Sequence, residues 1–233
     1  MTPRDPAPLR RVVFHVGLPK TGTTSIQAML HDHVGELAAR AVHVVTPGPS
    51  TRAMARAADR LGRGRLRDVI ARALFRRRAG RLLQDLRGSG AETAIVSNEN
   101  LLGVFTRSMY DPARIPSAVD ALVLLRDVFA SVESVSFVLY ERDLRALHRS
   151  AGNQRIRKKY MRDLDEWNRA FPDESVAGAL LAALREAGGA AVEIVSMERE
   201  ASGPGYLGEA ILRRAGAGPG FRPRREFHEN RSG

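Results

Sequence analysis

The chain has no cysteine among its 233 residues, which excludes disulfides, thiolate metal sites and cysteine nucleophiles. It also lacks an apolar run of the roughly eighteen residues that a membrane-spanning helix needs. Its first residues carry no apolar stretch or cleavage site of a secretory signal. Aromatic residues make up only 6% of the chain and no nucleic-acid-binding motif is present, so nucleic acid is not an expected partner. These absences favour a cytoplasmic protein without a transmembrane segment.

Lysine is scarce in a chain that is strongly basic. The formal net charge is +11, yet of the 37 basic residues only Lys20, Lys158 and Lys159 are lysines. The excess of arginine, together with abundant alanine and glycine, is typical of a GC-rich coding sequence. Each arginine is therefore a weak functional signal, and each lysine is a stronger one.

Short apolar runs alternate with helical patterns along the chain. The runs are 11–16, 42–46, 93–97, 121–125 and 191–196, and the helical patterns are 23–39, 51–87 (broken near Gly62–Gly64), 127–149, 163–171, 175–187 and 206–215. Buried strands that alternate with helices predict an α/β fold of three layers, with a central parallel sheet of about five strands. We expect a single domain over 1–233, with its core at 10–215 and an irregular C-terminal tail at 216–233.

Parallel sheets of this kind bind ligands beyond the carboxyl ends of their strands. The loops to consider therefore begin at Gly17, Thr46, Ser97, Arg126 and Ser196.

The loop after the first run, GLPKTGTTS at 17–25, has the composition of an anion site. A glycine-rich loop between a strand and a helix offers backbone N–H groups and a positive helix end to an oxyanion. Lys20 adds a mobile positive charge. The other candidate ligands are Pro19, Thr21, Gly22, Thr23, Thr24 and Ser25. The alternative interpretation is an ordinary turn whose hydroxyls cap the helix.

This loop differs from the Walker A motif, in which the lysine follows the second glycine. Here Lys20 precedes Gly22, so the use of ATP or GTP is disfavoured.

The string HVGLPKTGTTSIQ at 15–27 resembles the 5′-phosphosulfate loop of sulfotransferases that use 3′-phosphoadenosine 5′-phosphosulfate (PAPS), above all those of the bacterial branch. The resemblance implies a P-loop-like sulfotransferase fold, PAPS as the donor, no metal, and a catalytic role for Lys20. Weaker matches extend it over most of the chain: SNENLLG at 97–103, LDEWNRAF at 164–171 and GEAILRRAG at 208–216.

The family also binds the 3′-phosphate of the nucleotide, through an arginine that ends a later strand and a serine eight residues further on. Arg126 and Ser134 have that spacing here, and eight residues is close to a whole number of helical turns. The resemblance therefore implies that Arg126 and Ser134 hold the 3′-phosphate, with Ser131 a less favoured alternative.

Trp167 is expected to pack in the core rather than stack on adenine.

A basic C-terminal loop helps to hold the 3′-phosphate in animal relatives. The candidate substitutes in this chain are Arg222, Arg224 and Arg225.

Sulfuryl transfer needs a base for the acceptor group, and Glu99 is the first candidate because it follows the run at 93–97. Its competing role is a cap for a helix that starts near Asn100. His15 and His43 are the alternative bases, and each is otherwise a core histidine of a strand. No cluster of histidines and carboxylates has metal-ligand spacing.

Two regions concentrate positive charge. Residues 52–87 hold twelve arginines against three aspartates, and residues 142–162 hold a further eight basic residues. Such charge would recruit an anionic acceptor, such as an acidic glycan or a lipid head group, or form a solvated helix face.

Two other functions stay open: a nucleotide-dependent phosphotransferase (a kinase), and a non-catalytic protein that binds polyanions. The sequence specifies neither the acceptor nor the oligomeric state.

Overall fold

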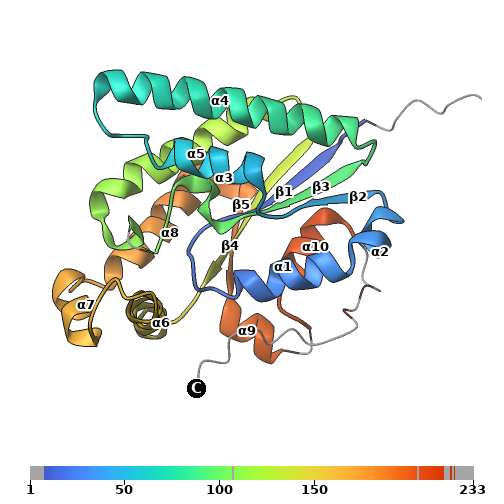
Figure 1. The fold of residues 1–233 in the computed structure, drawn as a ribbon. Coiled ribbons are helices and arrows are strands. Elements are labelled where there is room, and N and C mark those ends of the chain that lie inside the picture. Colours follow the sequence, from blue (N-terminus) through green and yellow to red (C-terminus); the bar gives the residue numbers. More distant parts are fainter. Residues whose placement is uncertain (1–7, 107, 204, 218–220, 222, 224–233) are drawn as a thin grey trace, which may run out of the picture.

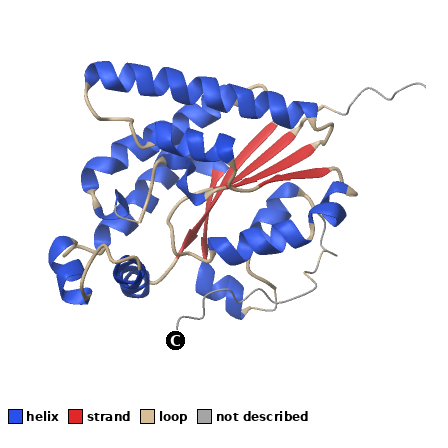
Figure 2. Cartoon of the chain, viewed as in Figure 1, coloured by secondary structure: helices blue, strands red, loops and turns tan. Residues whose placement is uncertain are grey.

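A parallel sheet lies at the centre of the molecule, with helices on both of its faces (Figures 1 and 2). The computed structural model describes residues 8–106, 108–203, 205–217, 221 and 223. The strands are β1 (Arg11–His15), β2 (Val42–Val45), β3 (Thr93–Ser97), β4 (Ser134–Glu141) and β5 (Val192–Ser196). They are all parallel and lie in the order β2-β3-β1-β4-β5. The α/β class and the five-stranded parallel sheet are as predicted.

Ten α-helices connect and cover the described strands. They are α1 (Thr23–Asp32), α2 (Val34–Ala38), α3 (Pro49–Ala58), α4 (Arg65–Gly88), α5 (Ile115–Val128), α6 (Leu144–Arg157), α7 (Leu164–Ala170), α8 (Ser175–Gly188), α9 (Met197–Ser202) and α10 (Glu209–Ala215). Four 3₁₀ turns are η1 (Glu99–Leu102), η2 (Ser108–Tyr110), η3 (Pro112–Arg114) and η4 (Gly189–Ala191). The predicted break near Gly62–Gly64 is confirmed, because it separates α3 from α4.

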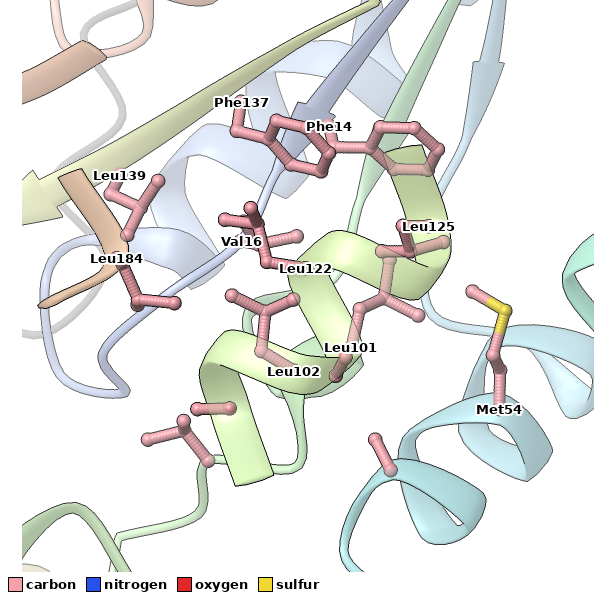
Figure 3. Packing of buried hydrophobic residues seen from close by; sticks show 14 of the residues in the cluster. Phe14, Val16, Met54, Leu101, Leu102, Leu122, Leu125, Phe137, Leu139 and Leu184 are labelled. Atoms are coloured by element: carbon pink, nitrogen blue, oxygen red, sulfur yellow. The ribbon is translucent and has the colours of Figure 1, made fainter. Parts of the chain in front are cut away.

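Side chains alternate between the two faces of the sheet and build two cores. Phe14 and Phe137 lie in the core that holds α3, α4, α5 and α8, and Figure 3 shows their rings beside Leu122 and Leu125 of α5. Val13 belongs to the opposite core, with α1, α2 and α10. Strands buried on both faces explain why β1 and β3 are continuously apolar in the sequence.

The prediction of a strand at 121–125 and a helix at 127–149 is wrong. Residues 121–125 lie inside α5, and β4 occupies 134–141, before α6. A short apolar run fits either a buried strand or a buried helix. Leucine and alanine at 121–125 favour a helix, whereas Val135, Phe137, Val138 and Tyr140 are β-branched or aromatic and favour a strand.

The carboxyl ends of β1 and β4 form a switch point of the sheet. The chain leaves β1 for α1, which packs in one core, and leaves β4 for α6 and α8, which pack in the other. Connections that diverge from neighbouring strands leave a crevice between them, where ligands of such folds bind. The relevant loops therefore begin at Val16 and Arg142, and Arg126 does not contribute one.

Candidate anion-binding site

The loop between β1 and α1 is shaped by three left-handed residues, Gly17 (φ 125°), Lys20 (φ 73°) and Gly22 (φ 79°). Such turns build nests of backbone N–H groups that bind anions. Gly22 is favoured by its φ, a backbone conformation that L side chains rarely adopt. A lysine in this conformation is uncommon and is typical of a functional turn.

The N-terminus of α1 has no side-chain cap and no acidic residue in its first turn. The hydroxyl of Thr21 donates to the carbonyl of Leu18 at 2.8 Å, so Thr21 supports the loop itself. Thr24 is exposed, and Thr23 Oγ1 is buried without a hydrogen-bond partner among the described residues. The N-cap is therefore a glycine without a side-chain cap, and a helix start of this kind favours an anion.

Positive charge surrounds the half-buried ammonium group of Lys20. Burial lowers its pKa, and the charges of Arg157, Arg142 and Lys158 lower it further. Like charges gathered around one ammonium are unfavourable unless an anion joins them. The cluster therefore fits a ligand that carries several negative charges.

Arg142 brings the end of β4 to the loop. Its Nη1 donates to the carbonyl oxygen of Lys20 at 3.3 Å, and its Nε lies 3.7 Å from a carboxylate oxygen of Glu198. That Nε is buried without a hydrogen-bond partner among the described residues. Ser150 lies eight residues further on in α6, and a pocket of about 560 Å³ is lined by Arg142, Arg145, Arg149, Ser150 and others.

The structure does not bring Arg126 and Ser134 to this site. Arg126 lies in the last turn of α5 and donates to the carbonyl of Ala187 at 3.2 Å. Ser134 begins β4 and pairs with Arg11 at the start of β1, so it lies at the amino edge of the sheet, opposite the Lys20 loop. Ser131, the less favoured alternative, lies in the turn before β4 and accepts a hydrogen bond from the Arg87 side chain. Arg126 thus lies in a helix and Ser134 in a strand, the reverse of the expected arrangement, because residues 121–125 are helical.

The signal that would have found Arg142 is present in the sequence. Arg142 and Ser150 have the same eight-residue spacing as Arg126 and Ser134, and they follow a segment rich in β-branched and aromatic residues. In the structure this arginine ends a strand and this serine lies in the next helix.

Glu99 lies beside the loop, as expected for a residue that follows β3. Its carbonyl accepts a hydrogen bond from the N–H of Gly17 at 3.2 Å. Its half-buried carboxylate accepts from Gln27 Nε2 at 3.3 Å and from Asn100 Nδ2 at 3.0 Å. The cap of η1 is Asn98, whose side chain accepts from the N–H of Asn100, so the carboxylate of Glu99 is not used as a cap.

Of the two histidine alternatives, His15 lies directly before the loop and His43 lies away from it. His15 is buried at the end of β1, with Nδ1 2.8 Å from Ser97 Oγ, and burial lowers its pKa to about 3. Its ring is therefore neutral at physiological pH. His43 is level with Ala94 near the start of the edge strand β2, away from the loop.

Trp167 is fully buried against Tyr110 and Phe171, which confirms the predicted core role.

Two further observations concern the described residues. No helix there is long and apolar enough to cross a bilayer. No group of three or more histidine, aspartate or glutamate side chains there is placed to hold a metal ion. Arg222, Arg224 and Arg225, and most of the tail beyond Ala217, lie outside the described part of the chain.

Comparison with known proteins finds similarity in structure. No protein-family model matches the chain, and no curated protein matches it. The crystal structure of a sulfotransferase from Alicyclobacillus acidocaldarius matches 92% of this chain and 84% of its own, with a TM-score of 0.50 and 16% sequence identity. At this identity the similarity shows the fold: the chain has the three-layer α/β fold of that sulfotransferase.

Proposed function

We propose that this protein is a sulfotransferase that moves the sulfuryl group of PAPS to a hydroxyl or amine group of an acceptor. The observation that carries the proposal is the hydrogen bond from Arg142 to the Lys20 carbonyl. It joins an uncapped, glycine-rich loop to an arginine at the end of the neighbouring strand. Two anion-binding elements at one edge suit a nucleotide with phosphates on both its 3′ and 5′ oxygens. The shared fold with a solved sulfotransferase supports the same conclusion.

The residues at this edge fit such a donor. Thr23 Oγ1 and Arg142 Nε are buried donors without hydrogen-bond partners among the described residues, although a Glu198 carboxylate oxygen lies 3.7 Å from that Nε. An unmade hydrogen bond of this kind costs about 1–3 kcal/mol. An anion that accepts from both would offset that cost. In our proposal Lys20 and the start of α1 hold the 5′-phosphosulfate, and Arg142 and Ser150 hold the 3′-phosphate.

The chain's own groups supply charge stabilisation and a base. When bound, PAPS supplies the sulfuryl group: the acceptor oxygen bonds to sulfur as the bond from sulfur to the bridging phosphate oxygen breaks. Lys20 neutralises charge on the phosphate that leaves with that electron pair. The Glu99 carboxylate takes the acceptor's proton, and Gln27 and Asn100 fix its orientation.

Ligand-dependent thermal stability tests the donor assignment. Adenosine 3′,5′-bisphosphate, the nucleotide product, should raise the melting temperature, because a ligand that binds only the folded state stabilises it. ATP with magnesium and an RNA oligomer are the comparison ligands. Stabilisation by ATP–magnesium alone would indicate a phosphotransferase, and stabilisation by RNA alone a polyanion-binding protein.

Transfer of label tests the reaction itself. The protein is incubated with ³⁵S-labelled PAPS and fractions of host-cell extract, and labelled products are separated. We expect label in one class of product with the wild-type protein and none with Lys20→Ala. Equal labelling by both proteins would remove Lys20 from the reaction.

A further inference from the structure

Helix α6 runs from the donor side of the proposed site toward the side of Glu99. Its amino-terminal half carries Ser150 and follows Arg142. Near its other end, Gln154 accepts a hydrogen bond from the Thr106 hydroxyl at 3.3 Å. Thr106 belongs to the connection that follows β3 and contains Glu99. The carboxyl end of α6 is therefore tied to the segment that holds the proposed base.

Three exposed cations gather at this end of α6: Arg157, Lys158 and Lys159. None has a carboxylate within ion-pair distance in the ranges that the structure describes. The charges of Arg157 and Lys158 reach Lys20. One of the chain's two other lysines thus acts on Lys20, which is unexpected for a merely solvated helix face in an arginine-rich chain.

The backbone holds this cluster in an uncommon turn. Lys159 adopts a left-handed conformation (φ 56°), and the N–H of Tyr160 donates to the carbonyl of Arg155 at 2.9 Å, which closes the helix end. Glycine is the usual residue in such a turn. A lysine here carries a conformational cost that glycine does not, which is consistent with a use for its charge.

Tyr160 adds an aromatic surface to the cluster. Its side chain is 62% exposed, and the guanidinium of Arg155 lies 4.1 Å from its ring centroid. A cation this close to the ring restrains an otherwise mobile side chain. An exposed, restrained aromatic ring is a stacking surface for the apolar C–H face of a sugar, while the cations beside it attract carboxylate or sulfate groups.

We propose that Arg157, Lys158, Lys159 and Tyr160 form the acceptor subsite, and that the acceptor is an acidic sugar. The assignment rests on the proposed function, because it places the sugar's hydroxyl between this cluster and the Glu99 carboxylate. The hydroxyl loses its proton to Glu99 as its oxygen bonds to sulfur, and the nucleotide departs with the electron pair of the broken bond. The cations bind the sugar's charged group and take no part in the transfer.

Direct binding tests the subsite without turnover. Titration calorimetry with saturating adenosine 3′,5′-bisphosphate compares a galacturonic acid hexamer, maltohexaose as its neutral match, and vesicles containing phosphatidylglycerol. The variants are Arg157→Gln/Lys158→Gln and Tyr160→Ala. Arg77→Gln/Arg81→Gln on α4 is the control, because it removes the same charge from exposed positions in a separate helix.

We expect the hexamer to bind at least tenfold more tightly than maltohexaose. The Arg157→Gln/Lys158→Gln variant should weaken hexamer binding about tenfold, Tyr160→Ala should weaken it severalfold, and the α4 control should change it less than twofold. Stabilisation by the nucleotide should survive in Tyr160→Ala and in the α4 control. It should be weaker in Arg157→Gln/Lys158→Gln, because these two charges also act on Lys20.

Two results would overturn the subsite while leaving the proposed function intact. One is equal affinity for the galacturonic acid hexamer and for maltohexaose. The other is an equal loss of hexamer affinity in the α4 control. Binding of the vesicles in preference to the hexamer would also overturn it, in favour of a lipid head group. Failure of the nucleotide to stabilise the wild-type protein would overturn the proposed function, and the acceptor assignment with it.

Discussion

Replacing Arg142 by alanine should weaken the binding of adenosine 3′,5′-bisphosphate about thirtyfold. A hydrogen bond from a charged group contributes about 1.5–3 kcal/mol, and the Arg142 side chain is only 27% exposed, so solvent screens it less than a surface arginine. A loss near 2 kcal/mol corresponds to that factor, since 1.4 kcal/mol is tenfold. Titration calorimetry with the nucleotide measures it.

The choice of nucleotide separates a local effect from a general one. Adenosine 5′-monophosphate lacks the 3′-phosphate, so its affinity should fall less than threefold in Arg142→Ala. The wild-type protein should prefer the bisphosphate, and the variant should lose most of that preference. Arg142→Lys should recover only part of it, because an ammonium cannot bind a phosphate through two parallel N–H groups.

Arg126→Ala is the matched control, because Arg126 has the same residue type and also precedes a serine by eight residues. It lies at the amino edge of the sheet and should leave both affinities within twofold. A large loss in Arg126→Ala with none in Arg142→Ala would refute the placement of the 3′-phosphate. Equal losses for both nucleotides in Arg142→Ala would show that Arg142 only shapes the Lys20 loop.

The first loop was predictable because its signals are local. A β-branched run, a glycine and a lysine within a cluster of threonines and glycines define a strand, a turn and a helix start within about fifteen residues. Each of these signals is confirmed in β1, the left-handed residues and α1. Lys20 was informative because lysine is rare in this chain.

The partner of that loop has weaker local signals. The composition of 134–141 favours a strand, but the apolar run at 121–125 fits a buried strand as well. Whether 121–125 or 134–141 forms the strand beside β1 depends on packing between distant segments, such as Phe137 against Phe14. Arg126 and Ser134 are both assigned by their distance from the strand expected at 121–125. Because that segment is a helix, both assignments fail together. The hydrogen bond from Gln27 to Glu99 also joins residues far apart in the chain, and no local pattern indicates it.

Three further substitutions test the site and the core. Lys20→Ala should abolish labelling from PAPS and stabilisation by the nucleotide with an unchanged melting temperature of the free protein; retention of both would contradict its role. Glu99→Gln should lower the transfer rate about 10²–10⁴-fold and leave nucleotide affinity unchanged, and an equal fall in affinity would instead assign Glu99 to the loop's structure. Gly152→Ala would place a Cβ 2.8 Å from Trp167 Cδ1; overpacking costs about 1–3 kcal/mol and exceeds the roughly 1 kcal/mol that alanine adds to a helix. The melting temperature should therefore fall by about 3 °C, whereas Gly80→Ala, whose Cβ meets no heavy atom within 4 Å, should raise it. A fall in both variants would mean that helix geometry, rather than the contact with Trp167, sets the cost.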